Sequence, residues 1–290
     1  MPKPPWLKVK IPSTGEYRQV RDTLRHFGLY TVCEEARCPN VAECFHEGTA
    51  TFLILGKVCS RHCRYCNVAH GEPRGVDEEE PERLVRAAKE MGLSYVVITS
   101  VTRDDLFDGG AGIFARCVEL LRRSLPESRV EVLIPDFRGS GDALNRVIEA
   151  GPDVINHNME VARPLFHTLR PEGDYRLSLD ILRQVKEDKN GIRSKSGFMV
   201  GFGEKPNDIR HLIDDLAAVE CDFLTIGQYL QPTRDHWPVQ KFYSPEEFDE
   251  FQRFALQRGF QSVQSGPLVR SSYNAAKYAG ERHTAQGKVD

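Results

Sequence analysis

The chain has 290 residues, enough for one large domain, for two small ones or for an α/β barrel. Its 39 Lys and Arg residues nearly balance 42 Asp and Glu residues, so it lacks the net basic field of a dedicated nucleic-acid binder. No stretch approaches the ~20 apolar residues of a membrane span, and the segment MPKPPWLKVK looks like neither a signal peptide nor a transit peptide. We therefore expect a cytoplasmic protein with no nucleic-acid and no membrane partner.

Most of the cysteines form two groups of three near the amino terminus. The groups are Cys33, Cys38 and Cys44 in CEEARCPNVAEC, then Cys59, Cys63 and Cys66 in CSRHCRYC. In a cytoplasmic protein such grouping indicates metal more often than disulfides, so a disulfide framework is the weaker alternative. Each group is one sulfur short of the four thiolates that usually hold an iron-sulfur cluster, and we predict two such clusters.

Apolar, β-branched runs recur along the rest of the chain and are typical of buried parallel strands. They are Thr51 to Lys57, Tyr95 to Ser100, Val130 to Ile134, Val154 to Asn158, Gly197 to Gly201 and Phe223 to Tyr229. Segments with helical periodicity lie between them, for example Glu80 to Gly92 and Asp208 to Val219. Gly92 and Gly151 stand where helix carboxy-terminal caps are expected.

This alternation predicts an α/β fold in which six strand-helix units curl into a partial (β/α)6 barrel. A doubly wound open sheet is the competing topology. Either fold collects functional residues at the carboxyl ends of the strands. We expect an N-terminal extension over residues 1–50, the barrel over 51–260 and a carboxy-terminal segment over 261–290. The N-terminal segment from Trp6 to Val32 should wrap the barrel and present the first cysteine group over its mouth.

The second cysteine group resembles the signature of the radical S-adenosylmethionine (SAM) superfamily, Cys-x3-Cys-x2-Cys with an aromatic residue, here Tyr65, before the last cysteine. The resemblance implies a [4Fe-4S] cluster with one open iron, to which SAM binds before it is cleaved to a 5'-deoxyadenosyl radical. Zinc is the alternative, with His62 as a possible further ligand. Zinc prefers a closed set of four ligands, which two separate sets of three fit poorly.

Three further segments resemble SAM-binding elements of the same superfamily, each at the end of a predicted strand. The residues that we assign to SAM from them are Asp108, Gly109, Gly110, Asn158, Glu160, Gly201 and Glu204. Each segment alone also has a plain structural interpretation as a glycine-rich turn, a polar strand end or a helix start. Their order along the chain is the order that the superfamily uses.

The first cysteine group resembles the auxiliary-cluster motif of the lipoyl synthases, and RSSY at residues 270–273 resembles the element that supplies the fourth ligand of that cluster. The correspondence implies Ser272 as the ligand, with Ser271 less favoured. From sequence alone, both serines could simply cap a helix. An alkoxide is a poor partner for soft iron-sulfur ligands, which suits a cluster that is dismantled in use.

The resemblance implies a sulfurtransferase that uses two [4Fe-4S] clusters and SAM to insert sulfur at C6 and C8 of a protein-bound octanoyl-lysine. Cys59, Cys63, Cys66 and Ser272 are the predicted catalytic residues. The implied partners are an octanoylated lipoyl-carrier domain or H protein, a reductant such as ferredoxin or flavodoxin, and a cluster-repair protein. A biotin synthase-like enzyme, a methylthiotransferase and a non-enzymatic iron-sulfur carrier are the alternatives.

Two cysteines remain outside the groups. We interpret Cys117 and Cys221 as small buried apolar residues in helices rather than as ligands. The acidic run from Asp77 to Glu80 is expected to begin a helix and to face solvent.

Overall fold

The computed structural model describes residues 3–8, 15–36, 38, 40–46, 50–188, 191–273 and 275. The predicted segments 1–50 and 261–290 therefore lie partly outside the described residues. None of the helices in this described part has the length and apolar character that a membrane crossing requires.

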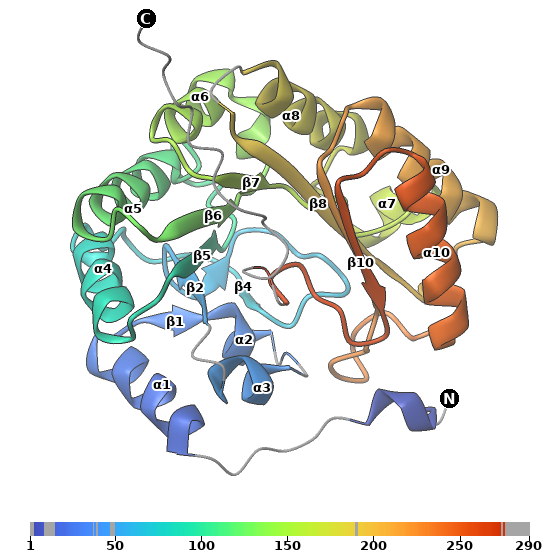
Figure 1. Ribbon diagram of the computed structural model, residues 1–290, viewed down its shortest axis with the longest axis horizontal. Helices are drawn as coiled ribbons and strands as arrows, with labels where there is room; N and C mark the ends of the chain where they lie inside the picture. Colours follow the sequence, from blue (N-terminus) through green and yellow to red (C-terminus); the bar gives the residue numbers. More distant parts are fainter. Residues whose placement is uncertain are drawn as a thin grey trace, which may run out of the picture.

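One curved sheet forms the centre of the molecule (Figure 1). Its strands, in spatial order, are β1 (Tyr30–Thr31), β2 (Thr51–Ile54), β5 (Tyr95–Ser100), β6 (Arg129–Leu133), β7 (Val154–Asn156), β8 (Arg193–Val200), β9 (Phe223–Gln228) and β10 (Ser262–Gly266). From β2 to β10 every neighbouring pair is parallel, whereas β1 runs antiparallel to β2. Because each parallel strand pairs with the next one along the chain, the sheet is singly wound, and the doubly wound alternative is excluded.

The helices cover the outer face of this sheet, so the predicted partial barrel is confirmed (Figure 1). They are α4 (Glu80–Glu90), α5 (Ala111–Ser124), α6 (Gly141–Glu149), α7 (Arg163–Leu169), α8 (Tyr175–Glu187), α9 (Pro206–Ala218) and α10 (Pro245–Gln257). Within the described residues the strand order ends at β1 and β10, which leaves the barrel open between them. Gly92 and Gly151 adopt φ values of 63° and 74°, as expected for residues that end helices.

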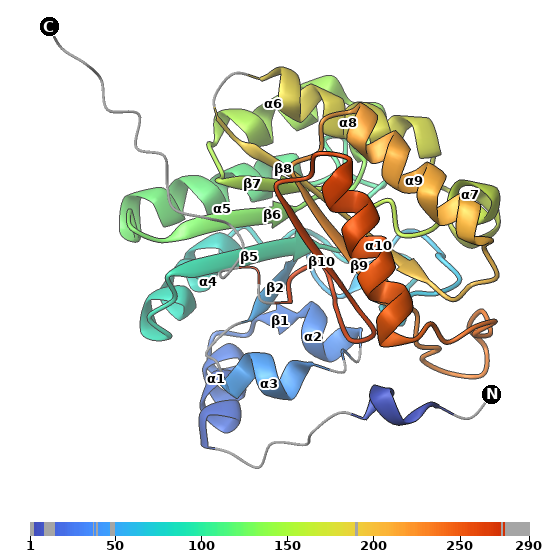
Figure 2. The same cartoon turned by 45° about the vertical axis from the view of Figure 1, so that its right-hand side comes forward.

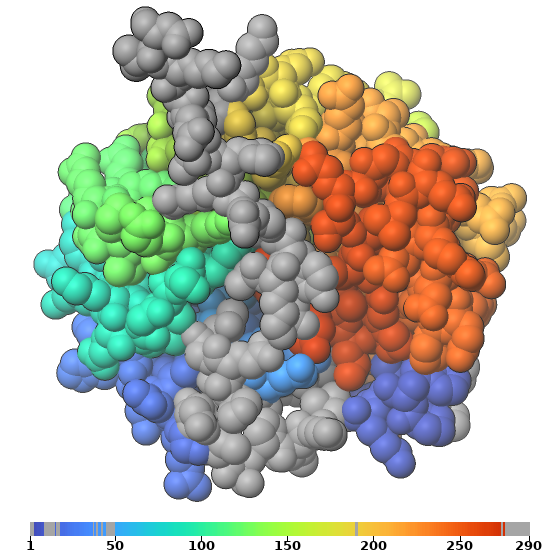
Figure 3. Space-filling model, in the orientation of Figure 1, coloured from blue at the N-terminus to red at the C-terminus, as the bar shows by residue number. Residues whose placement is uncertain are grey.

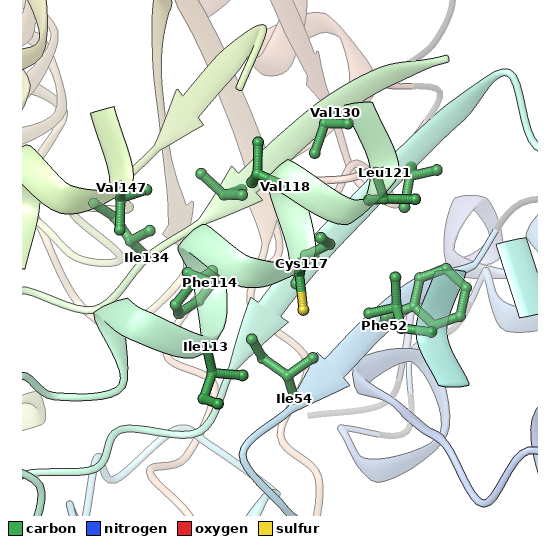
Figure 4. Close-up of a cluster of buried hydrophobic side chains, with 14 of the residues drawn as sticks. Phe52, Ile54, Ile113, Phe114, Cys117, Val118, Leu121, Val130, Ile134 and Val147 are labelled. Atoms are coloured by element: carbon green, nitrogen blue, oxygen red, sulfur yellow. The ribbon is translucent and has the colours of Figure 1, made fainter. Parts of the chain in front are cut away.

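Apolar contacts between α5 and the sheet show why this architecture forms (Figure 4). Phe114, Cys117 and Leu121 of α5 are completely buried, and the sulfur of Cys117 points toward Ile54 of β2. Burial of each large side chain of this kind stabilises the fold by about 1.5–3 kcal/mol. Cys117 is therefore a core residue, as predicted.

Two local expectations were wrong. Cys221 is buried, but it lies in the turn between α9 and β9 rather than in a helix. Glu80 begins α4, yet its side chain is buried instead of solvent-facing, because its carboxylate accepts a hydrogen bond from the backbone N–H of Leu55 at 2.7 Å. Burial raises the pKa of Glu80. The turn that follows β2 needs this partner, since Leu55 and Gly56 both have positive φ.

The sequence missed the start of one strand and the whole of another, because polar residues conceal them. β8 begins at Arg193 rather than Gly197, and β10 lies in the segment that we assigned to the carboxy-terminal region. The start of β8 is polar because Lys195 faces the barrel interior, where its ammonium group lies 2.8 Å from the Glu131 carboxylate. The same carboxylate accepts a hydrogen bond of 2.6 Å from the Tyr95 hydroxyl.

The N-terminal helices α1 (Gly15–His26), α2 (Val32–Glu35) and α3 (Val41–His46) lie at the β1 edge of the sheet (Figure 2). The short 3-10 helix η1 (Pro5–Leu7) lies apart from them. In Figure 3 its dark blue atoms lie below the orange and red atoms of the segment that includes α10. Another 3-10 helix, η2 (Phe137–Gly139), follows β6. A separate pair of short strands, β3 (Val58–Cys59) and β4 (Ala69–His70), frames the second cysteine group.

Candidate functional site

The loop that carries Cys59, Cys63 and Cys66 follows β2 and lies at the carboxyl ends of the parallel strands. Backbone contacts fix both ends of this loop. The Ser60 N–H donates to the carbonyl of Thr102, beyond β5, at 3.0 Å, and the Arg64 N–H donates to the carbonyl of Leu169 at 3.0 Å. The cysteines are therefore presented at the functional end of the barrel.

Arg61 is the main side-chain anchor of this loop. Its guanidinium group donates two hydrogen bonds to Asp104, at 2.7 and 2.9 Å, and two to Asp136, at 2.6 Å each. Burial opposes the charge of Arg61, but these two carboxylates raise its pKa overall. Sequence analysis missed Arg61, and its position between two cysteines of one motif was the available signal.

The three thiols of this loop lie close enough to influence one another. Burial, together with the negative charge that Cys63 and Cys59 can carry, raises the pKa of Cys66 to about 12. Burial also raises the pKa of Cys63, against the nearby Arg170 guanidinium, which lowers it. Because burial favours the protonated form of Cys63 and Cys66, protons compete with a metal cluster for these two thiols.

His62 does not join these thiols. Its side chain is 55% exposed, lies 3.4 Å from the Glu172 carboxylate and stacks edge-on with His70 at a centroid distance of 4.7 Å. In the described part of the chain, no group of three His, Cys, Asp or Glu side chains is arranged to hold a single metal ion. All eight cysteines, each at a described position, are free thiols.

The first cysteine group extends from α2 to α3. Cys33 lies in α2 and is buried, and the Cys38 N–H donates to the Cys33 carbonyl at 3.0 Å. Burial, together with the negative charge that Cys38 can carry, raises the pKa of Cys33 to about 11. Cys44 follows in α3.

The carboxy-terminal segment 268–273 completes the surroundings of this group. The Asn40 side-chain amide donates to the Leu268 carbonyl at 2.6 Å, and the Tyr273 hydroxyl lies 3.0 Å from the Glu43 carboxylate. These contacts join residues that are 228 and 230 positions apart in the sequence. They bring the RSSY element beside the first cysteine group.

A single cavity of about 490 Å³ joins the two cysteine groups. The predicted site residues that line it are Cys33, Cys38, Cys44, Cys66, Asn158, Glu160 and Ser272. Apolar side chains complete the wall, among them Leu133, Phe198 and Met199. Cys59 and Cys63 belong to the same loop as Cys66 but are not part of this wall.

Asn158 and Glu160 leave the end of β7 toward this cavity. The Asn158 side-chain amide donates to the Glu160 carboxylate at 2.9 Å, and Glu160 adopts a positive φ of 69°. Burial raises the pKa of Glu160, whereas the Arg170 guanidinium lowers it. Arg170, which sequence analysis also missed, donates to the carbonyl groups of Asn158 and Met159 at 3.1 and 3.3 Å.

The other residues that we assigned to SAM lie outside this cavity wall. Asp108 accepts hydrogen bonds from the N–H groups of Gly110 and Gly112 at the start of α5, and it lines a surface hollow of about 650 Å³. The Glu204 carboxylate accepts from the N–H groups of Gly201 and Phe202 at 2.7 and 2.9 Å. The larger hollow contains no cysteine, so the smaller cavity is the chemically relevant one.

The donor sets fit iron-sulfur clusters. The second group offers three neighbouring thiols and no fourth cysteine, and the first group offers three thiols with Ser272 on the same cavity wall. Thiolates are the usual cluster ligands. When a thiolate is absent, a hydroxyl oxygen is a weaker, harder ligand.

Comparisons with known proteins agree with this geometry. Residues 53–216 match the model of the radical SAM superfamily, and residues 2–38 match the N-terminal domain of lipoyl synthase. A lipoyl synthase of Caldicellulosiruptor bescii is 50% identical over 273 residues, which cover 94% of each chain. Another, from Chloroflexus aggregans, is 49% identical over 278 residues, which cover 96% of this chain and 91% of that one.

Solved structures show the same fold at much lower identity. Streptococcus suis SuiB bound to S-adenosylmethionine superposes with a TM-score of 0.59 at 15% identity, over 78% of this chain and 54% of that chain. HydG, a maturase of the [FeFe]-hydrogenase, gives a TM-score of 0.55 at 14% identity, over 79% of this chain and 61% of that chain. Given the match to both family models and the identity along nearly the whole chain, this protein belongs to the lipoyl synthase family of radical SAM enzymes.

Proposed function

We propose that this chain converts a protein-bound octanoyl-lysine to lipoyl-lysine by inserting sulfur at C6 and C8. The observation that carries the proposal is the single cavity that connects both cysteine groups with Asn158, Glu160 and Ser272. The methylene hydrogens at C6 and C8 are not acidic, so general acid-base catalysis has nothing to act on. A radical enzyme with an adjacent sulfur source meets this requirement.

In this proposal Cys59, Cys63 and Cys66 hold one [4Fe-4S] cluster, while Cys33, Cys38, Cys44 and Ser272 hold the other. When bound, the first cluster with SAM supplies the 5'-deoxyadenosyl radical, and the second supplies the sulfur. Asn158 and Glu160 orient SAM from the end of β7. The resemblance to the superfamily assigns Asp108, Gly109, Gly110, Gly201 and Glu204 to SAM as well, and we keep this assignment as part of the proposal.

The apolar wall of the cavity supports the assignment of an alkyl substrate. Leu133, Phe198, Met199 and Val269 line it together with the cluster ligands. An octanoyl chain that fills this space excludes water from the reacting carbon, and exclusion of water protects a reactive intermediate from side reactions. The polar lysine end of the substrate stays with its carrier domain at the cavity mouth.

The proposed chemistry also determines the partners. An octanoylated lipoyl-carrier domain or H protein delivers the substrate, and a ferredoxin or flavodoxin supplies electrons. Two SAM molecules are used for each lipoyl group. The sulfur-donating cluster is consumed, so a repair protein must rebuild it between turnovers. Free grouped thiols suit the reducing cytoplasm.

Anaerobic incubation with dithionite, SAM and an octanoyl-lysyl peptide tests the proposal. Mass spectrometry should detect methionine, 5'-deoxyadenosine and a peptide that has gained two sulfur atoms. A biotin synthase-like enzyme or a methylthiotransferase would cleave SAM but leave this peptide without sulfur. A non-enzymatic iron-sulfur carrier would produce neither methionine nor 5'-deoxyadenosine. Either result would contradict the proposal.

A further inference from the structure

We propose that Ser271 is a positioning residue that holds Ser272 at a fixed place relative to the SAM side of the cavity. The inference rests on the proposed function, because it concerns how the sulfur source is aligned with the radical. Ser271 was the less favoured candidate for the fourth cluster ligand. Its hydrogen bonding gives it a different role.

The side-chain amide of Asn158 joins Ser271 to Glu160. Its nitrogen donates to the Ser271 hydroxyl oxygen at 2.7 Å and to a Glu160 carboxylate oxygen at 2.9 Å. A primary amide has two N–H hydrogens, so these two bonds use both of them. Because a carboxylate oxygen of Glu160 accepts one of these bonds, the nitrogen of the amide, and not its oxygen, lies toward Glu160. The planar amide of Asn158 therefore links the Glu160 carboxylate, which we assign to SAM, to Ser271 of the RSSY element.

Two glycines make room for this link on the inner face of the barrel. A Cβ atom at Gly197 of β8 would lie 3.2 Å from the Ser271 hydroxyl oxygen and 2.3 Å from that of Thr225. A Cβ atom at Gly227 of β9 would lie 2.2 Å from the Val269 carbonyl oxygen. The segment therefore packs directly on the bare backbone of two neighbouring strands.

On its other side, segment 268–273 is bound to the first cysteine group through Asn40 and Glu43. Ser272 thus stands between two anchors, one toward the auxiliary-cluster cysteines and one toward SAM. The anchor toward SAM is the bond from Asn158 to Ser271. Catalytic groups need to be held within about 0.5 Å of the productive geometry, and such alignment is the function that this bond can provide.

Loss of the bond should separate SAM cleavage from sulfur insertion. Without the Ser271 hydroxyl, the cysteines and Ser272 still hold both clusters, and Asn158 still contacts Glu160. The substrate radical then meets a less well aligned sulfur source, and more radicals are quenched before they capture sulfur. The ratio of 5'-deoxyadenosine to lipoyl product should therefore rise above two.

The test compares Ser271→Ala with Ser271→Thr and with Ser265→Ala. Threonine keeps a hydroxyl, so Ser271→Thr should keep the ratio of 5'-deoxyadenosine to lipoyl product near two. Ser265 is the matched control, because its hydroxyl donates to the Phe248 carbonyl at 2.8 Å, away from Asn158. For Ser271→Ala we expect the ratio to rise about fivefold, which corresponds to about 1 kcal/mol, with unchanged iron content.

Hydrogen exchange of the cluster-free chain provides a readout that does not depend on activity. Peptides that cover residues 268–273 should exchange faster in Ser271→Ala than in Ser265→Ala. An unchanged ratio and unchanged exchange would refute the positioning role. Loss of about four irons would also refute it, because Ser271 would then be a ligand. If the unsubstituted protein makes no lipoyl product, the proposed function fails, while the exchange experiment still tests the bond.

Discussion

The guanidinium group of Arg61 donates hydrogen bonds at 2.6 Å to both carboxylate oxygens of Asp136. Arg61 lies between two cysteines of the radical SAM motif, whereas Asp136 follows β6. Only 7% of the Arg61 side chain and 2% of the Asp136 side chain are exposed. Burial opposes ionisation of Asp136, but its hydrogen bonds with Arg61 lower its pKa overall. The pair therefore fastens the cysteine loop to the barrel.

Substitution of Asp136 should lower the free energy of unfolding. Asp136→Asn preserves the shape of the side chain but leaves the Arg61 charge without its buried partner, so that only the half-buried Asp104 remains. Loss of a buried partner typically costs about 3–5 kcal/mol. Urea unfolding of the cluster-free chain measures this loss. The control is Glu82→Gln, which breaks a surface pair with Arg116 and should cost far less, because water screens exposed charges. Equal costs for the two variants would argue against an anchoring role.

The two cysteine groups should be separable by mutation. Cys63→Ala should abolish SAM cleavage, whereas Cys38→Ala should retain some cleavage and lose sulfur insertion. Each variant should fall from about eight irons per chain to about four. Iron and sulfide quantification of anaerobically purified protein, together with product analysis, checks both statements. The division of roles is wrong if a well-folded Cys38→Ala protein loses both activities equally.

Ser272→Cys should make the auxiliary cluster harder to dismantle. A thiolate is a softer ligand than an alkoxide and binds cluster iron more firmly. The variant should release iron to a chelator more slowly and should form lipoyl product more slowly than the unsubstituted chain. Undiminished lipoyl formation would contradict the idea that a labile ligand is needed.

His157 should make stability depend on pH. The ring is 1% exposed, and Nδ1 lies 2.9 Å from the Ile134 carbonyl oxygen. Burial, reinforced by the Arg170 charge, lowers its pKa from 6.5 to about 4. Between these values the unfolded chain binds a proton that the folded chain does not, so stability falls as pH falls through this window, by up to about 3 kcal/mol.

Denaturant unfolding of the cluster-free chain at about pH 7 and about pH 5 measures this effect. Other groups also titrate in this range, so the informative quantity is the difference between the unsubstituted chain and His157→Gln. The substitution should reduce the loss of stability at the lower pH. If both chains lose the same amount of stability, His157 is not the group responsible.

The sequence predicted the parts of the fold that depend on local pattern. Apolar runs such as Tyr95–Ser100 identified strands, because a strand buried on both faces needs apolar residues throughout. β10 escaped detection because Gln264 and two serines interrupt its pattern. Lys195 concealed the start of β8 for a similar reason, since its charge is neutralised by Glu131 from another strand.

In the candidate site, too, the sequence revealed residues in local motifs and missed residues whose partners are distant in the sequence. The cysteine groups and Asn158 were visible because the ligands follow short motifs. Arg170 and the supporting role of Ser271 were not, because their partners lie far away in the sequence. The bond between Asn158 and Ser271 spans 113 positions, so its two ends meet only in the folded chain.

The ion pair between Lys195 and Glu131 limits how deeply a substrate can enter the barrel. Gly197 of β8 and Leu133 of β6 line the cavity, and Lys195 and Glu131 lie two residues earlier on the same faces, one layer deeper. The Tyr95 hydroxyl also donates to Glu131, so the three side chains form one buried charged group beneath the cavity. Under the proposed function, an acyl tail that entered from the cysteine side would meet this charged group, and the product would leave by the route along which the substrate came.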